Sequence, residues 1–454
     1  MKKVNNSAII GRIRSLIQGS VFALQTFNVL RFASFFLVSV LLVKIPLDVD
    51  QIADYEYVLF LSSIVTGWWI HGFLQSYMAD SVRLDDIRKG HLFRDYSRLY
   101  ALPGSVILIL IAVIIEVLSR SEILQNPPIG FYYFLIFHFI LHGCILIAYY
   151  FHQRNWHRGI YFLAVWFFLA YVGSFSMLLV DGVTLPRVYS WLVLLSLPIV
   201  VVWIYLYITS GTSIAFTPKK SYWPQLSILM LIQGIGFLSL WSDGFWVQYF
   251  YGTGEIFALF RYGGREFPLF VILTTTFSIA VIQEARTPEG WERIHDTSRR
   301  YIPLFLTMAI GLMLTSQYLF GWVYNESFVP ASFIFDMYLL LIIVRVLFPR
   351  PILIAHRYYK SLLLISVGEL LINLVLSFTF YWVWGLMGLI LGSLAAHLFE
   401  MGTTIYLVRS KLKIPVRQFI PIRYYLVFTV VLMMVFTLKY ALGGPEWLGN
   451  MITP

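Results

Sequence analysis

The chain has 454 residues, of which 59% are hydrophobic and only 12% are charged. A soluble globular domain carries about 25% charged residues, so this composition does not supply a water-facing surface. The formal net charge of +10 could suggest nucleic-acid binding, but the basic residues concentrate in alternate loops between apolar segments. That distribution is typical of a membrane protein and argues against a nucleic-acid partner.

Apolar runs of roughly 20 residues recur along the chain, and this length crosses about 30 Å of hydrocarbon as a helix. Unpaired backbone groups are not tolerated in lipid, so a spanning segment must be a helix or part of a closed barrel. The run at 106–115 lacks the period-two alternation of a barrel strand. We therefore predict an all-α polytopic membrane protein with 12–14 transmembrane helices. Its hydrophobic segments lie near 21–44, 57–78, 99–118, 130–151, 159–180, 188–209, 224–250, 256–282, 301–324, 330–348, 361–383, 386–408 and 424–442.

The N-terminal residues 1–20 are expected to form an interfacial amphipathic helix. Ile9, Ile13 and Ile17 recur at helical spacing among basic and polar residues, which makes one apolar face. No cleavable signal peptide is expected, because the basic N-terminus leads into a mixed stretch and then a full-length span.

The basic residues indicate the orientation of the chain. The loops on one side, together with the N-terminus, hold 25 of the 33 lysine and arginine residues. The opposite loops hold only Lys44, Arg120 and Arg187, and the loop at 46–56 is acidic. By the positive-inside rule the N-terminus is cytoplasmic. We expect a multi-pass protein of the bacterial inner (cytoplasmic) membrane.

The spacing of the segments indicates two similar halves. A span, a short acidic outer turn and a second span occupy 21–78, and about 200 residues later 224–282 repeats that layout. Two parallel six-helix halves are a known transporter plan. The expected parts are the interfacial helix, an N-terminal six-helix bundle at 21–209, a cytoplasmic linker at 210–223, a C-terminal six-helix bundle at 224–408, and an extra helix and tail at 409–454.

The densest intramembrane charge lies at the start of the eighth segment. Arg261 and Arg265 are four residues apart, so they project from one helix face, and two guanidinium groups on one face suit a phosphate or pyrophosphate. Glu266 could pair with either arginine. In the competing interpretation Arg261 reaches the outer interface and Arg265 pairs with Asp243 in the seventh segment.

Further polar residues inside the spans are candidates for ion coupling or charge pairing. Asp243 could neutralise an arginine or bind a coupling cation. Glu369 and Asn373 lie four apart in the eleventh segment, where they could bind a cation or act as polar contacts between helices. Arg31 in the first segment could face a central cavity or extend to the cytoplasmic interface. The remaining charges of this kind are Asp336, Arg345, His397, Glu400 and Lys439.

No metal site or cofactor is expected. His138 and His142 have a zinc-compatible spacing, but no third ligand is evident. The chain carries no P-loop, no HExxH motif and no recognisable Ser/His/Asp arrangement, so ATP hydrolysis and proteolysis are not supported. Outer loops of about ten residues are also short for a polysaccharide polymerase, so we do not expect an enzyme.

Several late motifs resemble the polysaccharide (O-antigen type) flippases of the multidrug/oligosaccharidyl-lipid/polysaccharide exporter superfamily. A basic inner loop at 357–360 (RYYK) precedes 368–374 (GELLINL), and 384–388 (WGLMG) and Gly392 follow. The stretch 260–268 (FRYGGREFP) looks like the family's eighth span. Members usually have twelve or fourteen spans, whereas thirteen segments are found here.

The resemblance implies two bundles around a central cavity that opens alternately to each side. It also implies that Arg31, Arg261 and Arg265 contact the head group of an undecaprenyl-pyrophosphate-linked oligosaccharide. The expected function is translocation of this lipid across the inner membrane for surface polysaccharide synthesis, with a polymerase or glycosyltransferase as partner machinery. The alternatives are an ion-coupled multidrug or small-molecule exporter of the same superfamily and a membrane enzyme acting on a lipid-linked sugar.

Overall fold

The computed structural model describes residues 20–81, 86–120, 130–210, 222–264 and 285–443, and within these ranges every regular element is a helix. The chain divides into two compact units. Unit 1 comprises Met1–Leu47 and Tyr57–Gln233, and unit 2 comprises Asp48–Glu56 and Gly234–Pro454. The expected interfacial helix at 1–20 lies almost wholly outside the described residues.

The helices of the first half are α2 (Ser20–Lys44), α3 (Val49–Ser81), α4 (Asp86–Arg120), α5 (Gly130–Gln153), α6 (His157–Ser176), the 3-10 turn η1 (Met177–Leu179) and α7 (Leu185–Thr209). Those of the second half are α8 (Tyr222–Tyr251), α9 (Glu255–Gly263), α11 (Pro288–Val323), η2 (Glu326–Phe328), α12 (Ala331–Leu339), α13 (Ile342–Arg345), α14 (Arg350–Ala355), α15 (Tyr359–Lys411), η3 (Val416–Gln418) and α16 (Ile422–Gly443).

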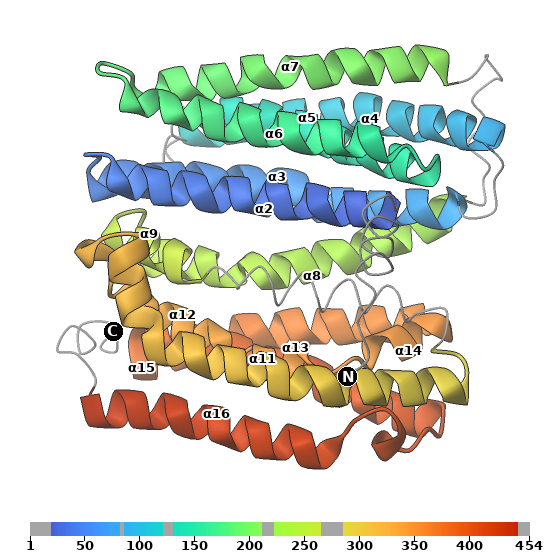
Figure 1. Cartoon of the computed structure of the whole chain (residues 1–454), viewed down its shortest axis with the longest axis vertical. Helices are drawn as coiled ribbons and strands as arrows, with labels where there is room; N and C mark the ends of the chain where they lie inside the picture. Colours follow the sequence, from blue (N-terminus) through green and yellow to red (C-terminus); the bar gives the residue numbers. More distant parts are fainter. Residues whose placement is uncertain (1–19, 82–85, 121–129, 211–221, 265–284, 444–454) are drawn as a thin grey trace, which may run out of the picture. The chain divides into compact units, whose positions relative to one another are not determined.

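Unit 1 is held together by aromatic packing between neighbouring helices. Within it α2 packs against α5 and α6, and α7 packs against both of these (Figure 1). The rings of Phe93 and Tyr150 stack with centroids 4.3 Å apart, which joins α4 to α5. The indole of Trp203 on α7 donates a hydrogen bond of 3.1 Å to Ser97 on α4. Large buried rings contribute much of the packing energy of such a core.

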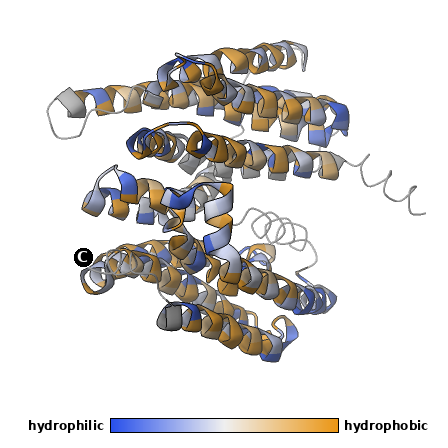
Figure 2. Ribbon diagram, turned by 60° about the vertical axis from the view of Figure 1, so that its left-hand side comes forward, coloured by the Kyte–Doolittle hydropathy of each residue, from blue (hydrophilic) through white to orange (hydrophobic). Residues whose placement is uncertain are grey.

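The outward surface of the helices is apolar, as a lipid-facing surface requires. On α4 the side chains of Leu102 and Ile109 are 70% and 62% exposed. Figure 2 shows hydrophobic residues along most of the length of the helices, with hydrophilic residues at many of their ends. Among the described residues, eight helices are long and apolar enough to cross a bilayer. The protein is a multi-pass membrane protein.

Most of the expected spans coincide with observed helices. The eleventh and twelfth segments are the two parts of α15, which turn at Trp384 and Gly385. Gly385 has φ 53° and ψ −135°, a backbone conformation that a residue with a Cβ rarely adopts. The eighth segment begins as α9, and its remainder at 265–284 lies outside the described residues.

Two helices extend well beyond their expected spans into basic loops. α4 begins at Asp86 and α11 at Pro288, whereas hydrophobicity alone placed the spans at 99 and 301. Thr287 forms the N-cap of α11, since its hydroxyl accepts a hydrogen bond of 3.2 Å from the backbone N–H of Gly290. A polar sequence can continue a helix in water once the apolar part has packed, so hydrophobicity underestimates helix length.

The tenth expected span, 330–348, is broken into α12 and α13. Between them Leu340 and Leu341 donate to carbonyl groups three residues back, which is the tighter 3-10 pattern.

The extra helix α16 packs against α11. Its Lys439 forms an ion pair of 2.5 Å with Asp336 of α12, and Ser316 of α11 donates to the same carboxylate oxygen at 3.0 Å.

Candidate functional site

The candidate site lies in unit 2, where the two parts of α15 fold back on each other. Their approach depends on Gly392, because a Cβ at this position would overlap the backbone of Ser377. The turn at Gly385 reverses the chain, so residues of the eleventh and twelfth expected spans face each other. Asn373 on the first part thereby comes against Ser393 on the second, and Ser377 against Leu389.

Asp243 on α8 is the acidic centre of this region. Its side chain is 3% exposed. Tyr338 of α12 donates to one carboxylate oxygen at 2.5 Å, and Ser393 donates to the other. A buried carboxylate is tolerated only when such donors or a cation compensate for its lost hydration.

Several neutral oxygen atoms lie beside this carboxylate. The Asn373 side-chain oxygen is 3.0 Å from the Ser377 hydroxyl and 3.2 Å from that of Ser393. The Ser377 hydroxyl is also 3.0 Å from the carbonyl oxygen of Leu389. Asp243, Asn373, Ser377, Leu389 and Ser393 therefore bring one carboxylate together with hydroxyl, amide and carbonyl oxygens. We call these five residues the oxygen cluster.

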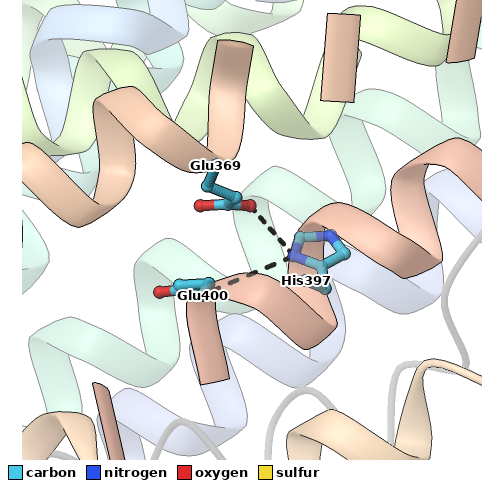
Figure 3. A group of neighbouring side chains, drawn as sticks. All are labelled: Glu369, His397 and Glu400. Atoms are coloured by element: carbon cyan, nitrogen blue, oxygen red, sulfur yellow. Dashed lines mark ion pairs between the residues drawn. The ribbon is translucent and has the colours of Figure 1, made fainter. Parts of the chain in front are cut away.

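A second group of polar residues adjoins the oxygen cluster. The Asn373 amide donates to the backbone oxygen of Ser239 at 3.3 Å, and the Ser239 hydroxyl donates to Glu369 at 3.1 Å. Glu369 in turn pairs with the Nδ1 atom of His397 at 2.9 Å. Figure 3 shows that Glu369 and His397 approach from the two parts of α15 and that Glu400 lies on the same side of the imidazole.

This second group ends at a surface arginine. Arg350 of α14 donates to one oxygen of Glu400 at 2.8 Å. The other Glu400 oxygen lies 4.0 Å from Nδ1 of His397, which is beyond hydrogen-bonding distance. We call Glu369, His397 and Glu400 the histidine cluster.

Arg261 on α9 has a carboxylate and an aromatic partner. Its Nε atom is 3.5 Å from Glu56, whose side chain is fully buried. The guanidinium carbon also lies 4.6 Å from the ring centroid of Trp241. Arg261 is thus held by an ion pair and by the ring face, and 15% of its side chain remains exposed.

Arg31 on α2 has a different environment. Its guanidinium lies over the ring of Phe32, 5.6 Å from the centroid. Across the described part of the chain, no carboxylate forms an ion pair with Arg31. An arginine inside a membrane span without a counter-charge is costly, which marks it as a candidate for binding an anion.

The structure brings together three of the sequence-predicted site residues. Asp243 and Asn373 share the oxygen cluster, and Glu369 adjoins it through Ser239. Arg31 belongs to unit 1, whereas Arg261 belongs to unit 2. Arg265 and Glu266 lie outside the described residues, and so do their expected contacts, including the pair of Arg265 with Asp243.

Sequence reasoning missed the neutral partners of these groups. Ser239, Ser377, Ser393 and Tyr338 carry no charge, and serine and tyrosine are common in transmembrane helices, so no sequence signal distinguished them. The pairing of His397 with Glu369 depends on the turn inside α15. Ser239 lies four residues before Asp243, and this spacing places both side chains on the same face of one helix. It was the one sign in the sequence that Ser239 belongs near the site.

Comparisons with solved structures identify the fold. A structure described as the lipid II flippase MurJ in an inward closed conformation matches with a TM-score of 0.59 and 13% identity, covering 95% of each chain. An outward-facing multidrug resistance MATE family transporter of the MOP superfamily matches with a TM-score of 0.60 and 14% identity over 88% of this chain and 97% of that one. A point mutant of a MATE transporter from Vibrio cholerae matches with a TM-score of 0.58 and 14% identity over 88% and 98%.

No protein-family model matches the sequence, and no curated protein matches it. The structural matches cover nearly the whole chain at low identity, so the likeness concerns the fold. These neighbours are named as transporters and a flippase, and none of the three is named as an enzyme. They do not single out the O-antigen type among the flippases. The chain therefore has the all-helical fold of these solved transporter and flippase structures, which is the fold class that the sequence predicted.

Proposed function

We propose that this protein is a flippase that translocates a lipid-linked oligosaccharide across the bacterial inner membrane for surface polysaccharide synthesis. Its N-terminus is cytoplasmic in this proposal, and the expected bundles at 21–209 and 224–408 are the moving parts. The substrate head group is a pyrophosphate, and the undecaprenyl chain stays in the bilayer. The fold shared with the MurJ lipid II flippase supports this class of substrate. Polymerase or glycosyltransferase enzymes would supply or consume the lipid.

The observation that carries the proposal is the environment of Arg31. It lies within α2 and has no carboxylate partner in the part of the chain that is described. A guanidinium at membrane depth that lacks an internal counter-charge suits an anionic ligand, because the ligand supplies the missing charge. Arg261 is the second contact, and it exchanges Glu56 for the pyrophosphate when the substrate binds. Arg265 is retained as a third contact on its spacing from Arg261.

The oxygen cluster is the proposed site of a coupling cation. One carboxylate among neutral hydroxyl, amide and carbonyl oxygens suits a monovalent cation, since the charges balance and no nitrogen ligand is present. Asp243, Asn373 and Ser393 belong to three separate helical segments, so an ion bound there favours the arrangement in which these segments are together. Glu369 adjoins the site through Ser239, and Glu266 is proposed as a further charge partner of the arginines.

A second candidate function is ion-coupled export of a multidrug or other small-molecule substrate. It is favoured by MATE transporter structures that match this chain with TM-scores close to that of MurJ. Cationic drugs need a negative binding site, whereas the candidate substrate residues here are arginines. An anionic small molecule would satisfy the same arginines, so the experiment must separate the two substrates.

The test is complementation of a host that lacks its own polysaccharide flippase. We expect the wild-type protein to restore surface polymer, and Arg31→Ala and Arg261→Ala to reduce it by at least about tenfold, the effect of losing one charge-assisted contact. Arg31→Lys should retain part of the activity because it keeps the charge. The matched control is Arg187→Ala, which removes an exposed arginine from the first turn of α7. All variants are compared at equal membrane levels.

Two results would contradict the proposal. If the wild-type protein fails in hosts that lack several different flippases, the flippase function is wrong, and export of anionic small molecules is assayed next. If the wild-type protein restores polymer but both alanine variants match Arg187→Ala, the flippase function stands and the arginine assignment is wrong.

A further inference from the structure

The histidine cluster adjoins the proposed cation site through Ser239 but shares no residue with the oxygen cluster. Its members are Glu369 on the first part of α15 and His397 and Glu400 on the second part. One ligand atom from each residue lies within 4.8 Å of the other two. Figure 3 shows both carboxylate groups beside the imidazole ring.

The distances within the cluster fit a small metal ion. Ligand atoms that bind one Zn²⁺ ion at about 2.0–2.2 Å lie about 3–4 Å from one another. Nδ1 of His397 is 2.9 Å from Glu369 and 4.0 Å from Glu400, so two of the three separations already match. The third separation, between Glu369 and Glu400, is at most 4.8 Å.

The groups behind the ligands hold them in place. The Ser239 hydroxyl donates to Glu369 at 3.1 Å, and Arg350 donates to the outer oxygen of Glu400 at 2.8 Å. Such contacts orient ligands in metal sites, and a carboxylate oxygen that accepts one hydrogen bond keeps a second lone pair for coordination. With a neutral imidazole, the two carboxylates are balanced by Arg350 and by Arg345, which lies near His397, so the ligand set and not a net negative charge argues for a cation here.

The surroundings allow an ion to enter. The side chains of His397 and Glu400 are 16% and 17% exposed, whereas that of Glu369 is 5% exposed. An open edge can also supply a water molecule as the fourth ligand. The candidate ligand atoms of the two clusters differ in kind. The histidine cluster offers an imidazole nitrogen and carboxylate oxygens, whereas the oxygen cluster offers oxygen ligands alone. Mixed nitrogen and carboxylate ligands favour transition metals over Mg²⁺ or Na⁺.

We propose that Glu369, His397 and Glu400 bind a divalent transition-metal ion such as Zn²⁺, which cross-links the two parts of α15. The site is independent of the proposed flippase function, because none of the arginines proposed to contact substrate takes part in it. Bound metal would hold the two parts of α15 together beyond the contacts they make without it.

The test uses the full-length protein purified in detergent and treated with a chelator. Calorimetric titration with ZnCl₂ should show saturable binding that MgCl₂ does not reproduce. His397→Ala and Glu400→Gln should each weaken this binding by more than about tenfold. His295→Ala is the matched control, because His295 lies 3.3 Å from Asp296 on an exposed part of α11 and is not part of the cluster. Its affinity should equal that of the wild type.

A second measurement replaces Zn²⁺ with Co²⁺, whose visible absorption reports nitrogen and oxygen coordination. The absorption band should be lost in His397→Gln as well as in His397→Ala, which covers the case in which the alanine variant does not fold. The proposal is overturned if the wild type shows no saturable Zn²⁺ binding. Equal Zn²⁺ affinity in wild type and Glu400→Gln would overturn it as well.

Discussion

Ser393 donates a hydrogen bond to the carboxylate of Asp243, although 150 residues separate the two along the chain. Asp243 lies on α8 and Ser393 on the second part of α15, so the bond joins two helices inside unit 2. Asn373, on the first part of α15, contacts the same hydroxyl at 3.2 Å. Three helical segments therefore meet at one carboxylate, and a change in its charge affects all of them.

Asp243→Asn should abolish cation-dependent transport while the protein remains folded. The amide keeps the size of the side chain but removes the negative charge that a coupling cation needs. Ser393→Ala should weaken cation binding by about tenfold, because one hydrogen bond to a charged group is lost. The measurement is uptake of radioactive Na⁺, or a pH change, in proteoliposomes.

Ser366→Ala provides the matched control for these variants. Ser366 is a buried serine on the same long helix, and its hydroxyl has no hydrogen-bond partner within the described residues. It should behave as the wild type. Full cation-dependent transport by Asp243→Asn would show that the oxygen cluster is not the coupling site.

Gly392→Ala should destabilise the protein by about 1–3 kcal/mol, the usual effect of overpacking a close contact. The added Cβ would overlap the backbone of Ser377, which cannot move independently of its helix. Thermal unfolding in detergent measures the effect. Gly402→Ala on the same helix is the control, because nothing lies within 4 Å of the place its added methyl group would take, and it should be neutral or slightly stabilising. Equal melting temperatures for both variants would contradict the tight crossing inside α15.

Lys439→Met should destabilise the protein by about 3–5 kcal/mol, because it leaves the fully buried Asp336 carboxylate without its cation. The double variant Asp336→Asn/Lys439→Met should recover much of this loss, since no buried charge remains. Melting temperature and yield from the membrane provide the measurements. The destabilisation of the double variant is compared with the sum for the two single variants. If the two are equal, the ion pair is not the reason that Lys439→Met destabilises the protein.

Glu56→Gln should increase the affinity for an anionic pyrophosphate head group. Glu56 lies 3.5 Å from the Arg261 guanidinium and competes for it, so removing its charge favours the substrate. About tenfold tighter binding corresponds to about 1.4 kcal/mol. The measurement is binding of a lipid diphosphate to the purified protein. Glu56→Asp keeps the charge and should behave more like the wild type, whereas weaker binding by Glu56→Gln would contradict a competing role.

The sequence was sufficient to predict the class of fold and most of its helices. A transmembrane helix can be predicted from local sequence, because it needs only an apolar run of sufficient length and a hydrogen-bond partner for every backbone group. The extension of α4 and α11 into basic loops was not predictable in this way, because those turns are polar. The break between α12 and α13 was missed because the stretch 330–348 is apolar almost throughout, so hydrophobicity gives no sign of it.

The candidate site was predictable only in its charged members. Asp243 and Glu369 are conspicuous because a carboxylate inside a hydrophobic segment is rare. Nothing in the sequence indicated that His397 pairs with Glu369, or that Asp336 pairs with Lys439 of α16 and not with an arginine of its own span.

The sequence by itself determined that the chain spans a membrane as helices and which side chains bring charge into those helices, because both depend on local composition. Tertiary structure alone decided the partners of those charges. The turn at Gly385 and the close approach at Gly392 place residues from different helices within hydrogen-bonding distance. In a low-dielectric interior such contacts determine whether a charge is stabilised, and they depend on packing between distant segments.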